Sequence, residues 1–331
     1  MKKVLSVVVP SYNIEHYIEQ CLKSFLNLDI LNDIEVLIID DGSKDKTGEI
    51  GKSYASHYPE IFRYIYKKNG GHGSAINKGL QCSVGKYFMV VDGDDWVKTK
   101  ELKKLVNYLK DIDSDLVAMD YVRVSESVKQ RISCNAPQYN IEYQFSELDV
   151  GKYYFVMSAI CYKTEILKRI HLRLPENMYY VDLIYIIKPM NSVKTVIFFN
   201  IAPYQYRIGD ESQSISAVNM AKNYEQHKDV VLELLNFYET CEPNLKQTAY
   251  IRATIIRAIL DNYYILLEYI PTIQDARKKL ISMDSFLFNH SYKEFYYSLP
   301  KKIKILRIGK YCILGVYRKI KRKRKYENFC G

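Results

Sequence analysis

Several features that would place a chain in a common class are absent from this sequence. No apolar run approaches the roughly 18 residues that a membrane-spanning helix needs. The early run Val4–Val9 is too short for a signal peptide and ends at Pro10, so it predicts a buried strand. The seven cysteines stand singly, with no Cys-x-x-Cys pair, which argues against a zinc knuckle or a disulfide framework. We expect a cytoplasmic protein.

Two common nucleotide-binding motifs are also missing. There is no Gly-x-x-x-x-Gly-Lys-[Ser/Thr], and no Gly-x-Gly-x-x-Gly follows the first predicted strand, which excludes Walker-type ATPases and Rossmann dehydrogenases. The glycines within Asn69–Ser74 favour a loop whose backbone approaches a nucleotide closely. His72 in this loop is expected to contact substrate or to begin a helix.

Excess positive charge is confined to one segment. The net charge is +10, but 12 Lys or Arg and no acid lie between Lys301 and Lys325, against 36 basic and 38 acidic residues elsewhere. The segment mixes these charges with apolar residues such as Ile303 and Ile320, as amphipathic helices on membrane surfaces do. We expect it to bind an anionic membrane surface and the protein to lie at the inner face of the cell membrane. A solvated tail and, less favoured, an RNA-binding tail are the alternatives.

The first part of the chain alternates short apolar runs with longer amphipathic segments up to about residue 122. This pattern predicts an α/β fold with a mostly parallel sheet. The predicted strands of this part are 4–9, 35–39, 63–66, 87–91 and 115–119, and its predicted helices are 15–26, 46–57, 74–82 and 100–109. A further strand is predicted later, at 196–200.

Later segments are harder to order. Residues 123–215 are less periodic, with loops expected around Pro175 and Pro203, and helical spacing returns over 219–288. We therefore predict three regions. They are a catalytic domain at 1–215 with halves 1–122 and 123–215, a helical region at 216–299, and a basic amphipathic tail at 300–331.

Polar clusters follow the early strands, where an open parallel sheet binds its ligands. The most informative is Asp92-Gly93-Asp94-Asp95. Adjacent carboxylates repel one another, and a hard divalent cation such as Mg²⁺ or Mn²⁺ neutralises them. A solvated acidic turn is the alternative for this segment taken alone.

The two preceding strand ends suggest a nucleobase site. Pro10 and Tyr12 follow the first strand and form a wall on which a base can stack. Asp40 and Asp41 follow the second, where one carboxylate can accept from a nucleobase N–H. The alternatives are a partly buried aromatic for Tyr12 and a turn into a capped helix for the acids, since Asp and Ser43 are good N-caps.

Taken together, these strand ends resemble family 2 glycosyltransferases, whose nucleotide-sugar-binding fold is called GT-A. The resemblance covers residues 3–120 strongly and 150–215 moderately. Its elements are Ser6 to Asn13, Ile39 to Ser43 with Asp45, the loop Asn69 to Asn77, and Asp92 to Asp95.

The resemblance implies roles for individual residues. Pro10, Tyr12 and Asp40, together with Asp41, would hold the nucleobase, commonly uracil. Asp92 and Asp94 would form the Asp-x-Asp metal motif, with Asp94 the direct ligand. Asn69 and Asn77 would line the donor pocket, and Arg207 would face the diphosphate, with a surface role as its alternative.

Inverting members of the family use a carboxylate base on the acceptor side. The matching segment is Met178 to Leu183, so Asp182 is the predicted base, although Val181 stands where the family usually has Glu. The alternative is an Asp that caps the following helix.

Trp96 is the only tryptophan, so the Gln-x-x-Arg-Trp motif of processive members is absent. We therefore expect a metal-dependent, non-processive transferase that moves a sugar from a UDP-sugar to a cell-surface polysaccharide, teichoic acid or lipid-linked acceptor. A sugar nucleotidyltransferase and a non-catalytic nucleotide-sugar-binding membrane scaffold are the alternatives. The former usually has a Gly-rich basic loop after the first strand, where this chain has Pro10 to Asn13.

Overall fold

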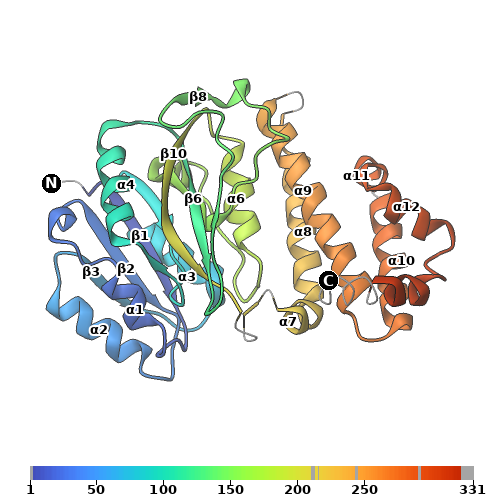
Figure 1. Cartoon of the computed structure of the whole chain (residues 1–331), viewed down its shortest axis with the longest axis horizontal. Coiled ribbons are helices and arrows are strands. Elements are labelled where there is room, and N and C mark those ends of the chain that lie inside the picture. Colours follow the sequence, from blue (N-terminus) through green and yellow to red (C-terminus); the bar gives the residue numbers. More distant parts are fainter. Residues whose placement is uncertain (1–2, 210–212, 215, 243–244, 290–291, 322–331) are drawn as a thin grey trace. The chain divides into compact units, whose positions relative to one another are not determined.

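The computed structural model describes residues 3–209, 213–214, 216–242, 245–289 and 292–321. The chain forms two compact units. Unit 1 comprises Met1–Asp210 and Cys241–Ile251, and unit 2 comprises Glu211–Thr240 and Arg252–Gly331. In Figure 1 the sheet of unit 1 runs from blue to yellow-green, and the helices of unit 2 from yellow to red. Within the described residues, no helix is long and apolar enough to cross a membrane.

Unit 1 contains one ten-stranded mixed sheet, with the central order β3-β2-β1-β4-β9-β6-β10-β5. The longer ladders, β1 with β2, β2 with β3, β1 with β4 and β6 with β10, are parallel. The shorter ladders are antiparallel and were not predicted. The strands are β1 (Leu5–Ser11), β2 (Ile34–Asp40), β3 (Phe62–Tyr66), β4 (Tyr87–Val90), β5 (Trp96–Val97), β6 (Leu116–Val124), β7 (Lys129–Ile132), β8 (Glu142–Gln144), β9 (Ile160–Lys163) and β10 (Thr195–Arg207). The predicted α/β class is confirmed.

Alternating side chains of the buried strands pack against helices on both faces of the sheet. Val7 and Val9 of β1 join a core that includes α1 (Ile18–Lys23) and α4 (Thr99–Asp111). Val8 points to the other face, where Gly79 of α3 (Gly71–Cys82) lies so close that a Cβ would meet the Val8 methyl groups. The remaining helices of unit 1 are α2 (Thr47–His57), α5 (Thr164–Arg169) and α6 (Asp182–Met190).

The loop expected around Pro203 is a strand instead. β10 continues from Thr195 to Arg207, and its register with β6 shifts between Phe199 and Tyr204. Proline cannot donate to a ladder, and it is tolerated at such an irregularity. The prediction was wrong because a proline alone does not distinguish a loop from a bulged strand. This continuation brings Tyr204 and Arg207 to the acidic cluster.

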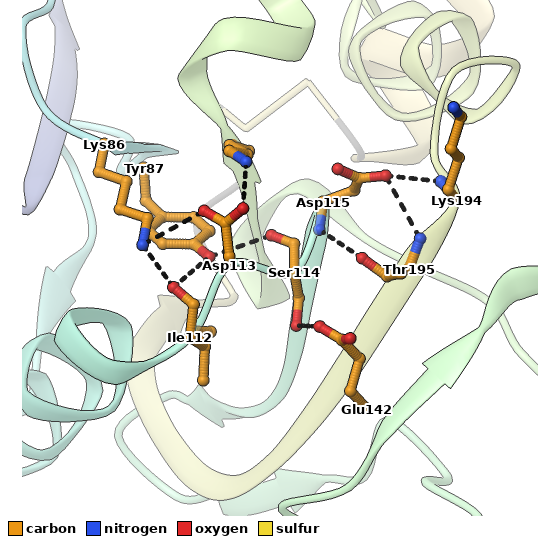
Figure 2. A network of polar contacts seen from close by, with 10 residues as sticks. Lys86, Tyr87, Ile112, Asp113, Ser114, Asp115, Glu142, Lys194 and Thr195 are labelled. Atoms are coloured by element: carbon orange, nitrogen blue, oxygen red, sulfur yellow. Dashed lines mark hydrogen bonds and ion pairs between the residues drawn. The ribbon is translucent and has the colours of Figure 1, made fainter.

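The amino ends of several strands are tied together by a polar network away from the acidic cluster. Figure 2 shows Asp115 accepting from the backbone N–H groups of Lys194 and Thr195, at 2.7 and 3.3 Å. Lys86 donates to the carbonyl of Ile112 at 2.5 Å, and its ammonium group lies 3.4 Å from the Asp113 carboxylate. These contacts fix the starts of β4, β6 and β10, so the network is structural.

A short segment beyond the main run completes unit 1. Tyr250 is buried, and its hydroxyl accepts from the Phe155 N–H at 3.1 Å. Its ring also packs edge-on against Phe145, and Gln247 donates to the carbonyl of Val193 at 2.8 Å. Cys241–Ile251 is therefore part of the unit 1 core, although the sequence prediction placed it in the helical region.

Unit 2 is helical, as the spacing over 219–288 predicts. Its described elements are α7 (Ala217–Lys222), α8 (Tyr224–Tyr238), the later part of α9 (Lys246–Tyr264), the π-helical η4 (Ile265–Tyr269), α10 (Ile273–Asn289), α11 (Lys293–Ser298) and α12 (Lys301–Ile308). A second short helix follows α12 and reaches residue 321. The predicted basic tail is thus partly a folded portion of unit 2, and its residues 322–331 lie outside the described residues.

A buried ion pair connects α12 to the rest of unit 2. Arg307 Nε donates to Asp284 Oδ1 at 2.6 Å, and its guanidinium also donates to the Tyr263 hydroxyl at 2.9 Å. Tyr311 donates to Asp284 Oδ2 at 2.7 Å. Only 8% of the Arg307 side chain and 17% of the Asp284 side chain are exposed. The start of the basic segment therefore contributes to folding.

Candidate active site

The acidic cluster follows β4 at the carboxyl edge of the parallel strands, as the sequence predicts. Its last member, Asp95, is buried and accepts from the Tyr204 hydroxyl at 2.6 Å and from the Arg207 N–H at 2.7 Å. Burial and the neighbouring charges of Asp94 and Asp92 raise the pKa of Asp95 well above its usual value. Asp95 therefore joins the cluster to the end of β10.

Asp92 contacts the glycine-rich loop. One oxygen of its carboxylate lies 2.8 Å from Nε2 of His72, in the first turn of α3. Its backbone N–H donates to the Tyr204 hydroxyl at 3.2 Å. Burial lowers the pKa of His72, but the charges of Asp92, Asp182 and Asp94 outweigh this effect, so the pKa is raised overall. A protonated His72 is favoured in this acidic surrounding.

Asp94 is partly buried, as Asp92 is. Burial raises its pKa to about 6, and the nearby charge of Asp92 contributes to the rise. Among the residues that the structure describes, no group of three or more His, Cys, Asp or Glu is arranged to hold a metal ion. The two carboxylates nevertheless fit a divalent cation in charge and ligand type, since the charged form of Asp94 is disfavoured without one.

Arg207 is held between two aromatic rings. Its guanidinium carbon lies 4.8 Å from the ring centroids of both Tyr17 and Trp96. Nε donates to the Asp94 carbonyl at 2.8 Å, and a terminal nitrogen donates to Gln20 Oε1 at 2.7 Å. The guanidinium is thus already used in shaping the acidic loop.

The carboxylates of Asp40 and Asp41, at the end of β2, accept hydrogen bonds from other residues of the chain. Asp40 accepts from the Ser43 N–H at 2.8 Å and from the Tyr64 hydroxyl at 2.5 Å. Asp41 accepts from Lys67 Nζ at 2.5 Å and from the Gly71 N–H at 2.7 Å. Both are buried, so the structure uses them to hold the turn and the glycine-rich loop.

The residues of the predicted base wall differ in exposure. Pro10 is buried within β1, whereas 46% of Tyr12 is exposed. Asn69 donates from its side chain to the Asp41 carbonyl at 2.9 Å. Tyr12 therefore presents an open ring to a ligand, and Asn69 is exposed beside the turn that it holds.

Asn77 lies away from the loop edge and pairs with the chain before α6. Its side chain donates to the Leu174 carbonyl at 2.8 Å and accepts from the Leu174 N–H at 2.9 Å. Nearby, the Asn177 N–H donates to the Gly70 carbonyl at 2.6 Å. Gly71 has φ +83°, and a Cβ there would lie 3.1 Å from the Asn177 nitrogen. These contacts fix the predicted base segment against the glycine-rich loop.

Asp182 is the first residue of α6, but the N-cap position is held by Val181 with no side-chain cap hydrogen bond, so Asp182 is not the helix cap that the alternative expects. Burial raises its pKa, and the charge of His72 partly offsets this rise, while that of Asp92 adds to it. The Leu183 N–H contributes a hydrogen bond that favours the charged form. Asp182 stands 90 residues after Asp92 in the sequence, yet the fold brings it close enough for the charges of Asp92 and His72 to affect its pKa.

The residues that hold the cluster in place were missed by the sequence reasoning. Tyr204 and Asp95 are 109 positions apart, and no local motif connects them. The sequence around Tyr17 and Trp96 likewise does not predict that Arg207 lies between their rings. The one available signal was the third acid, Asp95, which was recognised as part of the cluster without a separate role.

Replacing Tyr204 with Phe is expected to destabilise unit 1 by about 1–3 kcal/mol. The change leaves a buried Asp95 oxygen without its donor and the Asp92 N–H without its acceptor. Chemical denaturation measures the effect, with Tyr58→Phe as the matched control because Tyr58 is 39% exposed. A Tyr204→Phe midpoint equal to that of the control would show that the hydroxyl does not hold the cluster.

Part of the chain is similar in sequence to known glycosyltransferases. The pattern of the family described as Glycosyl transferase family 2 matches residues 6–170. The glycosyltransferase EpsJ of Bacillus subtilis, described as uncharacterized, is 37% identical over 125 residues, which are 38% of this chain and 36% of EpsJ. The minor teichoic acid biosynthesis protein GgaB of the same organism is 28% identical over 235 residues, 67% of this chain and 25% of GgaB. The matches thus span about a third or less of these two relatives.

Solved structures share the fold. The crystal structure of S. aureus TarS 1-349 in complex with UDP-GlcNAc superposes with a TM-score of 0.65 at 18% identity, covering 98% of this chain and 92% of that one. The mannosyltransferase PcManGT from Pyrobaculum calidifontis, in complex with GDP-Man and Mn²⁺, gives a TM-score of 0.57 at 15% identity, covering 96% and 87%. At such identities the likeness establishes the GT-A fold alone. Together with the family match, it identifies the chain as a glycosyltransferase of family 2 with a GT-A fold.

Proposed function

We propose that this glycosyltransferase moves a sugar from a UDP-sugar to a cell-surface polysaccharide, teichoic acid or lipid-linked acceptor, with inversion and one sugar per encounter. The observation that carries the proposal is that the glycine-rich loop contacts both sides of the site: His72 lies 2.8 Å from Asp92 of the acidic cluster, and Gly70 accepts from the Asn177 N–H just before the segment that contains Asp182. We assign the reaction to residues 1–215, with the donor in the half 1–122 and the acceptor in 123–215. The UDP-GlcNAc bound by TarS and the teichoic acid role of GgaB support these substrate classes.

We assign a divalent metal, Mg²⁺ or Mn²⁺, to Asp92 and Asp94. Such an ion is often held by one or two carboxylates together with substrate phosphates. The donor would therefore complete a ligand set that the side chains of the described residues do not form alone. When bound, the ion supplies positive charge for the diphosphate leaving group.

The donor would lie over the carboxyl ends of β1 and β2. Tyr12 supplies an exposed ring for stacking on the base, beside Pro10. Asp40 and Asp41 support this site by holding the turn and the glycine-rich loop rather than by an open carboxylate. Asn69 acts in the same way, whereas the contacts of Asn77 give it a role in holding the acceptor segment.

Two residues near the metal site would support it: one holds the acidic loop in place, and the other counters part of its negative charge. Arg207 donates to the Asp94 carbonyl, so we give it the role of fixing the acidic loop in place of a direct diphosphate contact. His72 lies 2.8 Å from the Asp92 carboxylate, and the nearby acids raise its pKa, which favours its charged form. A positive charge there counters part of the acidic repulsion before the donor arrives.

Asp182 would act as the base. It accepts the proton of the acceptor hydroxyl while that oxygen attacks the anomeric carbon from the side opposite the leaving diphosphate, which inverts the configuration. A raised pKa makes a carboxylate a stronger base than an exposed one. Its place at the start of α6 orients the carboxylate without the Glu that the family usually has before it.

We further propose that the basic segment 301–325 places the enzyme at the inner face of the cell membrane. Anionic lipid attracts basic residues near its surface, and a lipid-linked acceptor would be concentrated there.

Thermal shift with UDP, GDP and CDP, each with and without Mn²⁺, tests the donor and metal assignments. A ligand at about 100 times its Kd stabilises the folded chain by about 2.7 kcal/mol. We expect UDP with Mn²⁺ to raise the Tm, and Asp94→Ala to abolish the Mn²⁺-dependent part. The exposed Asp149→Ala is the matched control. A shift with GDP or CDP alone would reassign the donor, and no shift with any nucleotide would contradict the proposal.

A further inference from the structure

The segment from α12 to residue 321 is apolar on two sides. One side packs into unit 2 through Ile303, Leu306, Tyr311 and Leu314, all buried. The other side, which we call the outer face, remains in solvent. It consists of Ile305, Ile308, Ile313, Val316 and Ile320, with exposed fractions of 50, 86, 51, 59 and 51%. Five large apolar side chains on one short segment are more than scattered surface residues would give.

The basic residues of the same segment fall into two groups. Some are occupied inside unit 2, since Arg307 pairs with Asp284, and Arg318 donates to the carbonyls of Leu267 and Leu266 at 2.7 and 3.0 Å. A second group is exposed and forms no ion pair with any described residue; its members are Lys301, Lys304, Lys310 and Lys319. The outer face is therefore bordered by free positive charge.

An apolar hollow adjoins this segment. A cavity of about 610 Å³ is lined by Ile273, Gln274, Arg277, Lys278, Ile281, Tyr311 and Cys312. A Cβ on Gly315 would lie 3.2 Å from the Ile273 side chain, so the hollow meets the second short helix. Ile273 and Ile281 are 47 and 36% exposed. The hollow thus adds partly exposed apolar side chains of α10 beside this segment.

We propose that the outer face docks on an anionic lipid bilayer, with its five apolar side chains entering the interface and the four free lysines contacting lipid headgroups. An amphipathic segment binds a membrane through the burial of its apolar side chains and through the attraction of its basic residues to anionic lipid. A second copy of the chain fits less well, because a twofold contact through this face would set two basic borders against each other. This inference rests on the membrane placement proposed above and names the residues that would produce it, but it does not depend on the catalytic assignment.

The proposal differs from binding by a flexible basic tail. Such a tail would hold the protein by charge alone, and salt would release it. A folded apolar face retains much of its affinity in salt, because burial of apolar surface is not screened. Deletion of the segment is a poor test, since it also removes Arg307 and four buried core residues, so substitutions on the outer face are required.

Co-sedimentation with vesicles tests the proposal. The full chain is mixed with phosphatidylcholine vesicles, with and without phosphatidylglycerol, at low and high salt. Ile308→Ser with Ile313→Ser is expected to lower the partition coefficient on anionic vesicles about tenfold or more. Val84→Ser with Val218→Ser is the control, because these apolar side chains lie elsewhere and are 53 and 76% exposed. This control variant is expected to have the partition coefficient of the wild type.

Three results would overturn the proposal. They are no binding of the wild type to anionic vesicles, equal binding by the outer-face variant, and complete release of the wild type by salt. Light scattering is run in parallel, because a dimer that the outer-face variant abolishes would assign the face to self-association. The UDP and Mn²⁺ thermal shift of each variant is expected to match wild type, so a failure of docking is distinguishable from a failure of the catalytic proposal.

Discussion

Asp182→Asn is expected to lower kcat by about 10²–10⁴-fold, the range that general base catalysis contributes. Asparagine has nearly the same shape and can still begin α6, but it cannot take the proton of the acceptor hydroxyl. Donor binding should persist, because Asp182 acts on the acceptor side in our assignment. Steady-state transfer at saturating donor and Mn²⁺ gives kcat, and the thermal shift with UDP checks that the donor still binds.

The exposed carboxylate Asp149 supplies the control for that experiment. Asp149→Asn removes an exposed negative charge in unit 1 that pairs only with Lys152 at 3.1 Å among the described residues. It should transfer at the wild-type rate. If Asp182→Asn turns over within about threefold of this control, a factor worth well under 1 kcal/mol, then Asp182 is not the base.

Arg307→Met is expected to destabilise unit 2 by about 3–5 kcal/mol, the cost of breaking a buried ion pair from one side. The substitution keeps an apolar chain of similar length but leaves Asp284 buried without its cation. Chemical denaturation of the full chain, monitored by far-UV circular dichroism, measures the loss. Because unit 2 is helical, its unfolding should dominate the early change in helical signal.

Arg252→Met provides a matched comparison within the same unit. Arg252 lies 2.7 Å from Glu294, close to the 2.6 Å of the Arg307 pair, but 35 and 43% of the two side chains are exposed. An exposed pair contributes about 0–1 kcal/mol. Equal losses for the two variants would contradict the buried role of Arg307, whereas partial recovery by Asp284→Leu in the Arg307→Met background would support it.

Much of the fold of unit 1 could be predicted because its signals are local. The first three long strands begin and end within a residue or two of the predicted runs, and each buried run is followed by a polar cluster. The short strands β5 and β8 could not be predicted. Each has two or three residues, and their pairing with β10 depends on chain that lies far away in the sequence.

The sequence predicts which residues belong to the candidate site, but it does not predict their hydrogen-bond partners. Asp41 stood where the family resemblance places a nucleobase contact, yet its partners Lys67 and Gly71 lie 26 and 30 residues later. A sequence pattern does not reveal such hydrogen bonds, because they form only after the strands pair.

The basic segment shows a different limit. Its apolar residues predict a helix with an apolar side, but both Ile303 and Ile305 are apolar, and only the packing of unit 2 decides which one is covered.

The division of the chain into units bears on how the enzyme can be cut for study. A fragment ending near residue 210 would retain every strand of the sheet but lose Cys241–Ile251. The pocket that Tyr250 fills beside Phe145 and Phe155 would then be empty, and the Phe155 N–H would lose its acceptor. The loss of a buried tyrosine from the core destabilises the fold, and the apolar surface exposed as a result favours aggregation during expression. A minimal catalytic fragment therefore needs residues 241–251 reconnected by a designed linker.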